Sequence, residues 1–191
     1  MREFHPADYG PVLAPLVSGD RCRPLDAGRT GESIRSALQL ATVESVFAQS
    51  PVRDRDMAAA AIAGVWLVHD FLDESHRISQ NIETPTGAFW HGVMHRREGD
   101  FANSKYWFRR VGAHDVLAEL DELVAQLADD AATSQLARDL MVGGHYDAFA
   151  MVNACEAAFR SSGPAADLCR RVQQAEWELL FDYSYRNAVA E

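Results

Sequence analysis

The chain has 191 residues, 48% hydrophobic and 24% charged, a composition typical of a single globular domain and not of a disordered chain. Acidic residues outnumber Lys and Arg by 28 to 18, a formal net charge of −10. That excess argues against a nucleic-acid partner, because affinity for a phosphate backbone comes from Lys and Arg. No apolar run reaches the roughly twenty residues of a membrane span. The sequence has no basic segment followed by an apolar one, so we do not expect a secretion signal. Three cysteines without a CxxC pair favour a reducing, cytoplasmic location.

Residues 1–31 carry four of the seven prolines (Pro6, Pro11, Pro15 and Pro24). Proline lacks the backbone N–H that a helix interior needs. We therefore expect an irregular N-terminal arm over 1–31, followed by a helical domain over 32–191.

Beyond the arm, apolar periodicity and capping signals predict eight helices. Ser50-Pro51, Thr84-Pro85 and Gly163-Pro164 are typical helix starts, and glycines such as Gly99 and Gly112 mark helix ends. The predicted helices are 32–49, 52–78, 85–98, 101–111, 115–129, 134–142, 146–161 and 165–188. No segment alternates as a strand does, so the expected fold is all-α: one domain of seven or eight mostly antiparallel helices.

Residues 89–112 place a small-residue helix, a Gly-Asp turn and an aromatic-rich helix in succession. This segment resembles one tetratricopeptide-type helix pair, with Gly92 where two helices could approach closely. Stacked repeats need about three units, and the sequence shows no second copy. An ordinary helical hairpin is therefore the favoured interpretation.

The same segment carries a Trp-His-Gly motif followed by His-Arg-Arg-Glu, at residues 90–92 and 95–98. These motifs resemble the WHGxxHRREGD-type signature of an uncharacterised family of bacterial all-α proteins. The resemblance implies no function, so the chemistry has to come from the residues.

Two columns of polar side chains follow helical spacing at i, i+4 and i+7. His69, Asp73 and His76 form the first, on the predicted helix 52–78, and His91, His95 and Glu98 form the second, on the helix 85–98. Side chains at this spacing share one face of a helix. Each column lies beside apolar residues, where unpaired polar groups are costly.

If the two columns face each other, they predict a metal site. Imidazoles and a carboxylate on two facing helices suit Zn, Fe or Mn, and Glu156 or Glu176 could add acids. His91 and His95 do not form an HExxH motif, because Gly92 stands at the position of the general base. The alternative is structural, since His–carboxylate hydrogen bonds lock helices together without any metal.

A second constellation is basic. Arg96 and Arg97 end one predicted helix, and Asn103, Tyr106 and Arg110 share a side of the next one. Guanidinium groups recognise carboxylate or phosphate, which predicts a small acidic ligand. Internal salt bridges are the alternative explanation.

The function that these patterns favour is a small cytoplasmic protein with a His/carboxylate/Arg pocket for a small acidic ligand or a metal. If the pocket is catalytic, hydrolysis is the least demanding chemistry, with His91 or His69 as general base or ligand. The competing hypothesis is a non-catalytic protein–protein interaction module built on the helix pair at 89–112. A third hypothesis is that the histidines have only a structural role and that the function lies in a homo-oligomer surface.

Overall fold

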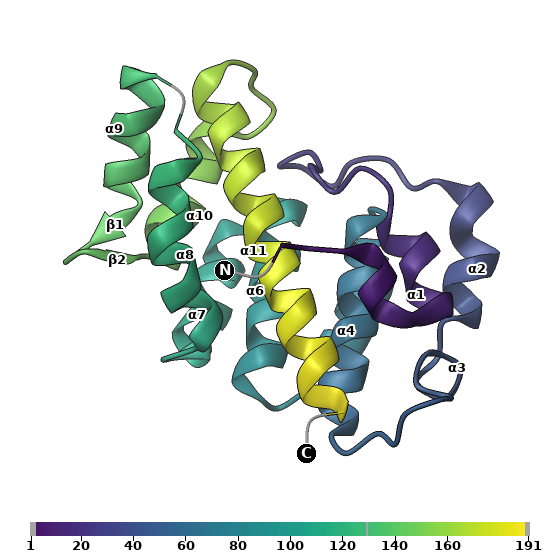
Figure 1. Ribbon diagram of the computed structural model, residues 1–191. Helices are drawn as coiled ribbons and strands as arrows, with labels where there is room; N and C mark the ends of the chain where they lie inside the picture. Colours follow the sequence, from purple (N-terminus) through teal and green to yellow (C-terminus); the bar gives the residue numbers. More distant parts are fainter. Residues whose placement is uncertain (1–2, 129, 190–191) are drawn as a thin grey trace.

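The computed structural model describes residues 3–128 and 130–189 (Figure 1). Its helices are η1 (Pro6–Tyr9), α1 (Gly10–Val17), η2 (Glu32–Ile34), α2 (Arg35–Leu40), α3 (Val43–Val46), α4 (Arg55–Val68), α5 (Leu72–Ser79), α6 (Pro85–Glu98), α7 (Phe101–Val111), α8 (Asp115–Gln126), α9 (Ala131–Asp139), α10 (Ala148–Ala158) and α11 (Pro164–Val189). A short antiparallel hairpin, β1 (Met141–Val142) and β2 (His145–Tyr146), interrupts them. The all-α prediction is confirmed. Among the described helices, none combines the length and the apolar character needed to cross a bilayer.

Helix α6 lies at the centre of the molecule. Every residue from Thr86 to Arg97 is buried, because α4, α5, α7, α10 and α11 all contact this helix. In Figure 1 it lies between α4 and α7, behind the long helix α11. Its ends agree with the prediction: the Thr84 hydroxyl accepts a hydrogen bond from the amide of Gly87, and Gly99 ends the helix at φ 88°.

Close packing at two tryptophans fixes α6 against α4 and α11. The Trp90 indole donates to the hydroxyl of Ser184 at 3.1 Å, and the Trp177 indole donates to the carbonyl of Gly64 at 2.9 Å. A Cβ atom at Gly64 would lie 2.6 Å from the Trp90 ring, so α4 can approach α6 this closely only with glycine at that position. The backbone that carries the histidines of α6 is therefore held on several sides.

The prediction of one continuous helix over 52–78 is wrong, because the chain breaks near the middle of this range. Helix α4 ends at Val68, His69 is its C-cap, and Asp70 takes the left-handed conformation with φ 66° before α5 begins at Leu72. The predicted helix 32–49 is also divided, into η2, α2 and α3. The side chains of Thr42 and Ser45 form a capping box that starts α3 separately.

The segment 1–31 is less irregular than expected, because it contains η1 and α1. Pro11 lies in the first turn of α1, where a missing N–H is tolerated, but Pro15 lies inside the helix. Burial of Leu13, Leu16 and Val17 against the core stabilises α1 despite that proline. Tertiary packing outweighs local propensity here.

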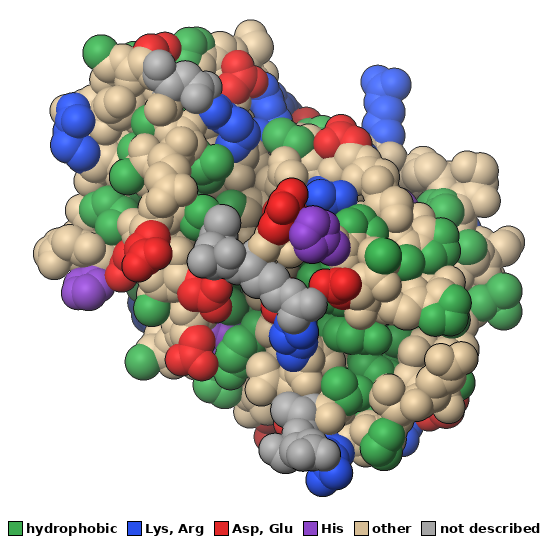
Figure 2. All heavy atoms as spheres, in the orientation of Figure 1, with side chains coloured by type: hydrophobic (Ala, Val, Ile, Leu, Met, Phe, Trp, Pro, Cys, Tyr) green, Lys and Arg blue, Asp and Glu red, His purple; other side chains and the backbone are tan. Residues whose placement is uncertain are grey.

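The region 131–146 differs from the prediction in two ways. Helix α9 begins at Ala131 rather than 134, because Asp130 and Thr133 form a capping box. The β1–β2 hairpin occupies residues for which no strand was expected. Gly143 and Gly144, with φ of 63° and 88°, supply the two-residue turn that joins it. Acidic side chains occur over much of the face in Figure 2, in keeping with the negative net charge.

Candidate metal centre

Three histidine side chains converge between α5 and α6. His76 comes from α5, and His91 and His95 come from α6. One ligand nitrogen of each ring lies within 4.8 Å of the others. All three belong to the set predicted from the sequence as metal ligands.

Helical spacing explains how the rings meet. His91 and His95, four residues apart, stack with ring centroids 4.7 Å apart and planes inclined by 17°. His76 approaches both rings edge-on from the neighbouring helix, at 4.6 Å from His91 and 5.3 Å from His95. The cluster thus joins α5 to the central helix.

His91 is the most confined of the three. It is 2% exposed and lies flat against the indole of Trp107, with ring centroids 3.9 Å apart. Neither Nδ1 nor Nε2 has a hydrogen-bond partner among the residues that the structure describes. Buried polar atoms are rarely left without one, because the loss of hydration is then uncompensated. A neutral imidazole carries one N–H and one lone pair, so the unprotonated nitrogen of His91 is the one that could bind an ion.

His95 has a partner on each side of its ring. Nδ1 lies 3.0 Å from Oε2 of Glu98, and Nε2 lies 3.1 Å from the amide nitrogen of Asn103. The amide nitrogen can only donate, so Nε2 accepts and the Nδ1–H donates to the carboxylate. This carboxylate–imidazole arrangement orients metal-binding histidines in many proteins. Glu98 thus supports His95, and is not one of the three converging groups.

Both histidines of α6 are held in the neutral form. Burial, followed by the proximity of His95 and His76, lowers the pKa of His91 to about 3. Burial also lowers the pKa of His95, against the opposing effect of Glu98. Neutral imidazole is the form that binds metals.

The ion-free protein should lose stability as the pH falls from 7 to 5. Unfolded His91 takes up a proton near pH 6.5, whereas native His91 does so only near pH 3. Between these values the unfolded state binds more protons, so stability rises with pH. We expect His91 to contribute a decrease of about 1–2 kcal/mol over this range. Urea unfolding in EDTA at pH 7 and pH 5 measures this decrease in the free energy of unfolding.

The control variant is His91→Phe, which cannot titrate and should remove the part of the decrease that His91 causes. An unchanged pH dependence in this variant would contradict the attribution of the decrease to His91.

The first predicted column does not form. The chain turns at residues 69–71, so His69 lies at the end of α4 whereas His76 lies on α5. The Nε2 atom of His69 contacts the carbonyl of Leu16 at 2.7 Å. Asp73 is on the exposed side of α5. His69 fastens α1 to the core, and only His76 of this column reaches the cluster.

Arg96 and Arg97 do not offer their guanidinium groups to a surface ligand. Arg96 is fully buried and forms an ion pair with Glu176, which was considered as a further metal ligand. Arg97 is 2% exposed; it pairs with Asp70 at 2.6 Å and donates to the carbonyl of Leu67 at 2.9 Å. The alternative of internal salt bridges therefore describes both residues.

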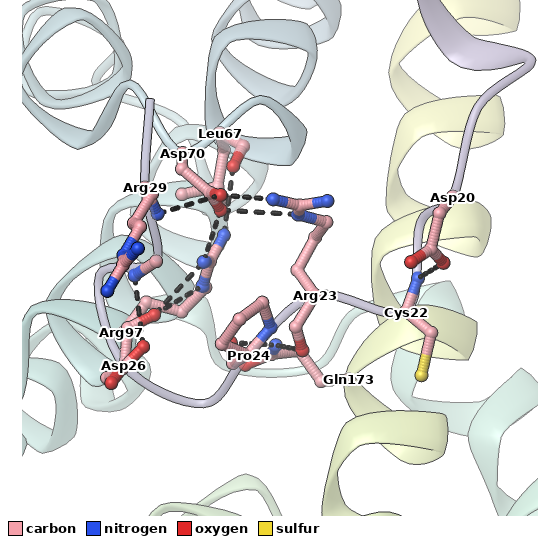
Figure 3. Close-up of polar contacts among 11 residues, drawn as sticks. Asp20, Cys22, Arg23, Pro24, Asp26, Arg29, Leu67, Asp70, Arg97 and Gln173 are labelled. Atoms are coloured by element: carbon pink, nitrogen blue, oxygen red, sulfur yellow. Dashed lines mark hydrogen bonds and ion pairs between the residues drawn. The ribbon is translucent and has the colours of Figure 1, made fainter. Parts of the chain in front are cut away.

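Asp70 is the structural residue that the sequence analysis missed. Its buried carboxylate also contacts the Arg23 guanidinium and, at 3.2 Å, the amide of Arg29, both from the N-terminal segment (Figure 3). Arg97 donates to the carbonyl of Asp26 in the same segment. The cluster fastens residues 23–29 to the corner between α4 and α5. No local sequence signal marks Asp70, because its partners Arg23 and Arg97 lie far from it in the chain.

The remaining predicted residues lie on α7. Asn103 contacts His95, as described above. Tyr106 is 48% exposed, and its hydroxyl accepts a hydrogen bond from Arg110 at 3.3 Å. The Arg110 guanidinium lies 5.1 Å from the ring centre of Trp107. Glu156, the other proposed acid, lies on α10 and not on α7; it is exposed, and its carboxylate lies 3.6 Å from the ammonium group of Lys105.

Comparison with known proteins gives no match to a family model, a curated protein or a solved structure. The resemblance to a bacterial family stays a prediction, and the candidate centre rests on its own geometry.

A separate cavity of about 340 Å³ lies between the N-terminal segment, α8 and α11. Its described lining combines apolar side chains with carboxylates, among them Phe4, Leu123, Glu119 and Asp182. None of the predicted ligand residues lines it. The convergence of three imidazoles thus makes the α5–α6 cluster the stronger candidate.

Proposed function

We propose that the protein binds a divalent transition-metal ion through His76, His91 and His95. The observation that supports this most strongly is His91, whose two ring nitrogens are buried without partners beside two further imidazoles. A phenylalanine would fill a flat, aromatic-lined slot without that cost. An ion supplies what the slot lacks, a group that bonds to a neutral nitrogen lone pair.

Zn²⁺ fits this donor set best. Three nitrogen donors without a carboxylate among them favour zinc over manganese, which prefers oxygen ligands. The ligand nitrogens lie within 4.8 Å of one another, whereas neighbouring donors around tetrahedral zinc lie roughly 3.3 Å apart. Small ring rotations would close the difference, above all at His76, which is only half-buried.

Zinc titration of the chelator-treated protein should show one site per chain. His76→Ala and His95→Ala should each weaken binding by about 100-fold or more, beyond the 10–100-fold typical of losing a supporting residue. His145→Ala is the matched control, because the His145 side chain is 80% exposed and pairs with Asp121. Calorimetry, together with metal analysis of the dialysed protein, measures the affinity and the number of ions. Equal affinities in the wild-type, His76→Ala and His95→Ala proteins would refute the proposal.

The proposal concerns ion binding in a cytoplasmic protein, a location supported by the free thiols of Cys22, Cys155 and Cys169. Hydrolysis would require a coordination position that stays open to water and substrate. His91 and His95 are 2% and 5% exposed, so an ion would meet solvent mainly past His76. What occupies the fourth position therefore decides between a catalytic and a structural ion.

A further inference from the structure

We infer that the side-chain carbonyl oxygen of Asn103 is the fourth ligand, so that the ion has a closed, structural coordination sphere. This inference rests on the proposed function. It adds a residue from α7 to a centre otherwise built from α5 and α6, and it predicts that the site has no open position for a substrate.

The first step is the choice of nitrogen on His95. Its Nδ1 is engaged with Glu98 at 3.0 Å, so Nε2 is the nitrogen free to bind an ion. The lone pair of Nε2 points at the amide nitrogen of Asn103, 3.1 Å away. An ion on Nε2 therefore enters the space between His95 and Asn103 and breaks that hydrogen bond.

The second step is that α7 cannot withdraw from α6. The Ser104 hydroxyl donates to the carbonyl of Gly92 at 2.7 Å. A Cβ atom at Gly92 would already lie 3.1 Å from the ring of Phe108. Asp100 also caps α7 by accepting a hydrogen bond from the amide of Asn103 itself, at 3.0 Å. Asn103 thus stays beside the centre when an ion enters.

The third step is the chemistry of the amide. Rotation of its end group by half a turn exchanges the nitrogen for the carbonyl oxygen, with little movement of the other atoms. The oxygen carries lone pairs that a cation accepts, whereas the NH₂ group would be repelled by it. The same side chain can therefore cap His95 in the ion-free protein and complete a tetrahedral N₃O set when the ion is bound.

Cobalt(II) substitution with azide as a probe tests this inference. Azide changes the visible absorption of a Co²⁺ centre when it replaces a bound water. We expect the wild-type spectrum to be insensitive to azide and Asn103→Ala to become sensitive, with roughly 10-fold weaker Co²⁺ binding. Asn103→Asp, which keeps an oxygen at the same place, should stay insensitive. Arg109→Ala is the matched control on α7, because Arg109 is exposed and its guanidinium lies 5.9 Å from the ring centre of Phe149 on α10.

The outcomes separate the two proposals. An azide response of the wild-type protein equal to that of Asn103→Ala would overturn the role of Asn103 and leave ion binding by the three histidines intact. A wild-type protein that binds neither Co²⁺ nor Zn²⁺ would refute the proposed function, and the inference with it. Circular dichroism of each variant establishes that it is folded before its spectrum is compared.

Discussion

Replacing Arg96 by methionine should lower the free energy of unfolding by about 3–5 kcal/mol. Arg96 and Glu176 have no exposed side-chain surface, and Nη1 of the guanidinium lies 3.3 Å from Oε1 of the carboxylate. Methionine keeps much of the volume but leaves the charge of Glu176 buried. The hydroxyl of Tyr146, which donates to Oε1 at 3.2 Å, is then the remaining partner described for that carboxylate. Urea unfolding at pH 7 measures the loss.

Two further variants separate charge burial from packing. Arg96→Met/Glu176→Met removes both charges and should recover much of the stability, because a buried ion pair is often replaceable by apolar groups. Arg55→Met removes a pair with Glu44 in which both side chains are about 70% exposed. That change should stay within about 0.5 kcal/mol of the wild-type protein. A loss in Arg96→Met as small as the loss in Arg55→Met would contradict the argument.

Replacing His91 by phenylalanine should make the ion-free protein more stable while abolishing zinc binding. Phenylalanine keeps the flat ring against Trp107 and removes two buried nitrogens that have no partner among the described residues. We expect a gain of about 1–2 kcal/mol in EDTA. A residue that lowers stability relative to an apolar ring is typical of a site kept for function.

Zinc should reverse this order of stability. At a free zinc concentration 100 times the dissociation constant, binding adds about 2.7 kcal/mol to the wild-type protein and nothing to His91→Phe. Denaturant unfolding of both proteins should therefore give the higher free energy of unfolding to His91→Phe in EDTA and to the wild-type protein at saturating zinc. If His91→Phe is the less stable protein in EDTA, the imidazole is a packing residue and the functional argument for it fails.

The parts of the fold that could be predicted from the sequence are those with local signals. Helices α6 and α7 begin and end where expected because Thr84, Gly99 and Asp100 act within a few residues of the helix ends. The corner at Asp70 has no such signal. Its left-handed conformation is held by Arg23 and Arg97, which are distant in the sequence, so the break between α4 and α5 could not be predicted from spacing.

In the candidate centre too, some contacts could be predicted from the sequence and others could not. His91, His95 and Glu98 share one helix, so their proximity follows from helical periodicity alone. His76 was selected for its relation to His69, which the turn at residue 70 abolishes; it reaches the cluster because α5 packs on α6. Asn103 was assigned to a small acidic ligand, and Trp107 was not among the predicted site residues. Their contacts with His95 and His91 depend on the pairing of α6 with α7, which no local pattern encodes.

The burial of α6 on all sides affects how the centre moves. A helix with no solvent-facing side cannot fray or open without disrupting its neighbours, so its amide protons exchange only when most of the molecule unfolds. We therefore expect His91 and His95 to belong to the part of the protein that opens last, unlike side chains on a mobile loop. Such rigidity holds their two rings in register before any ion arrives, and leaves His76 on the shorter helix α5 to make the adjustment.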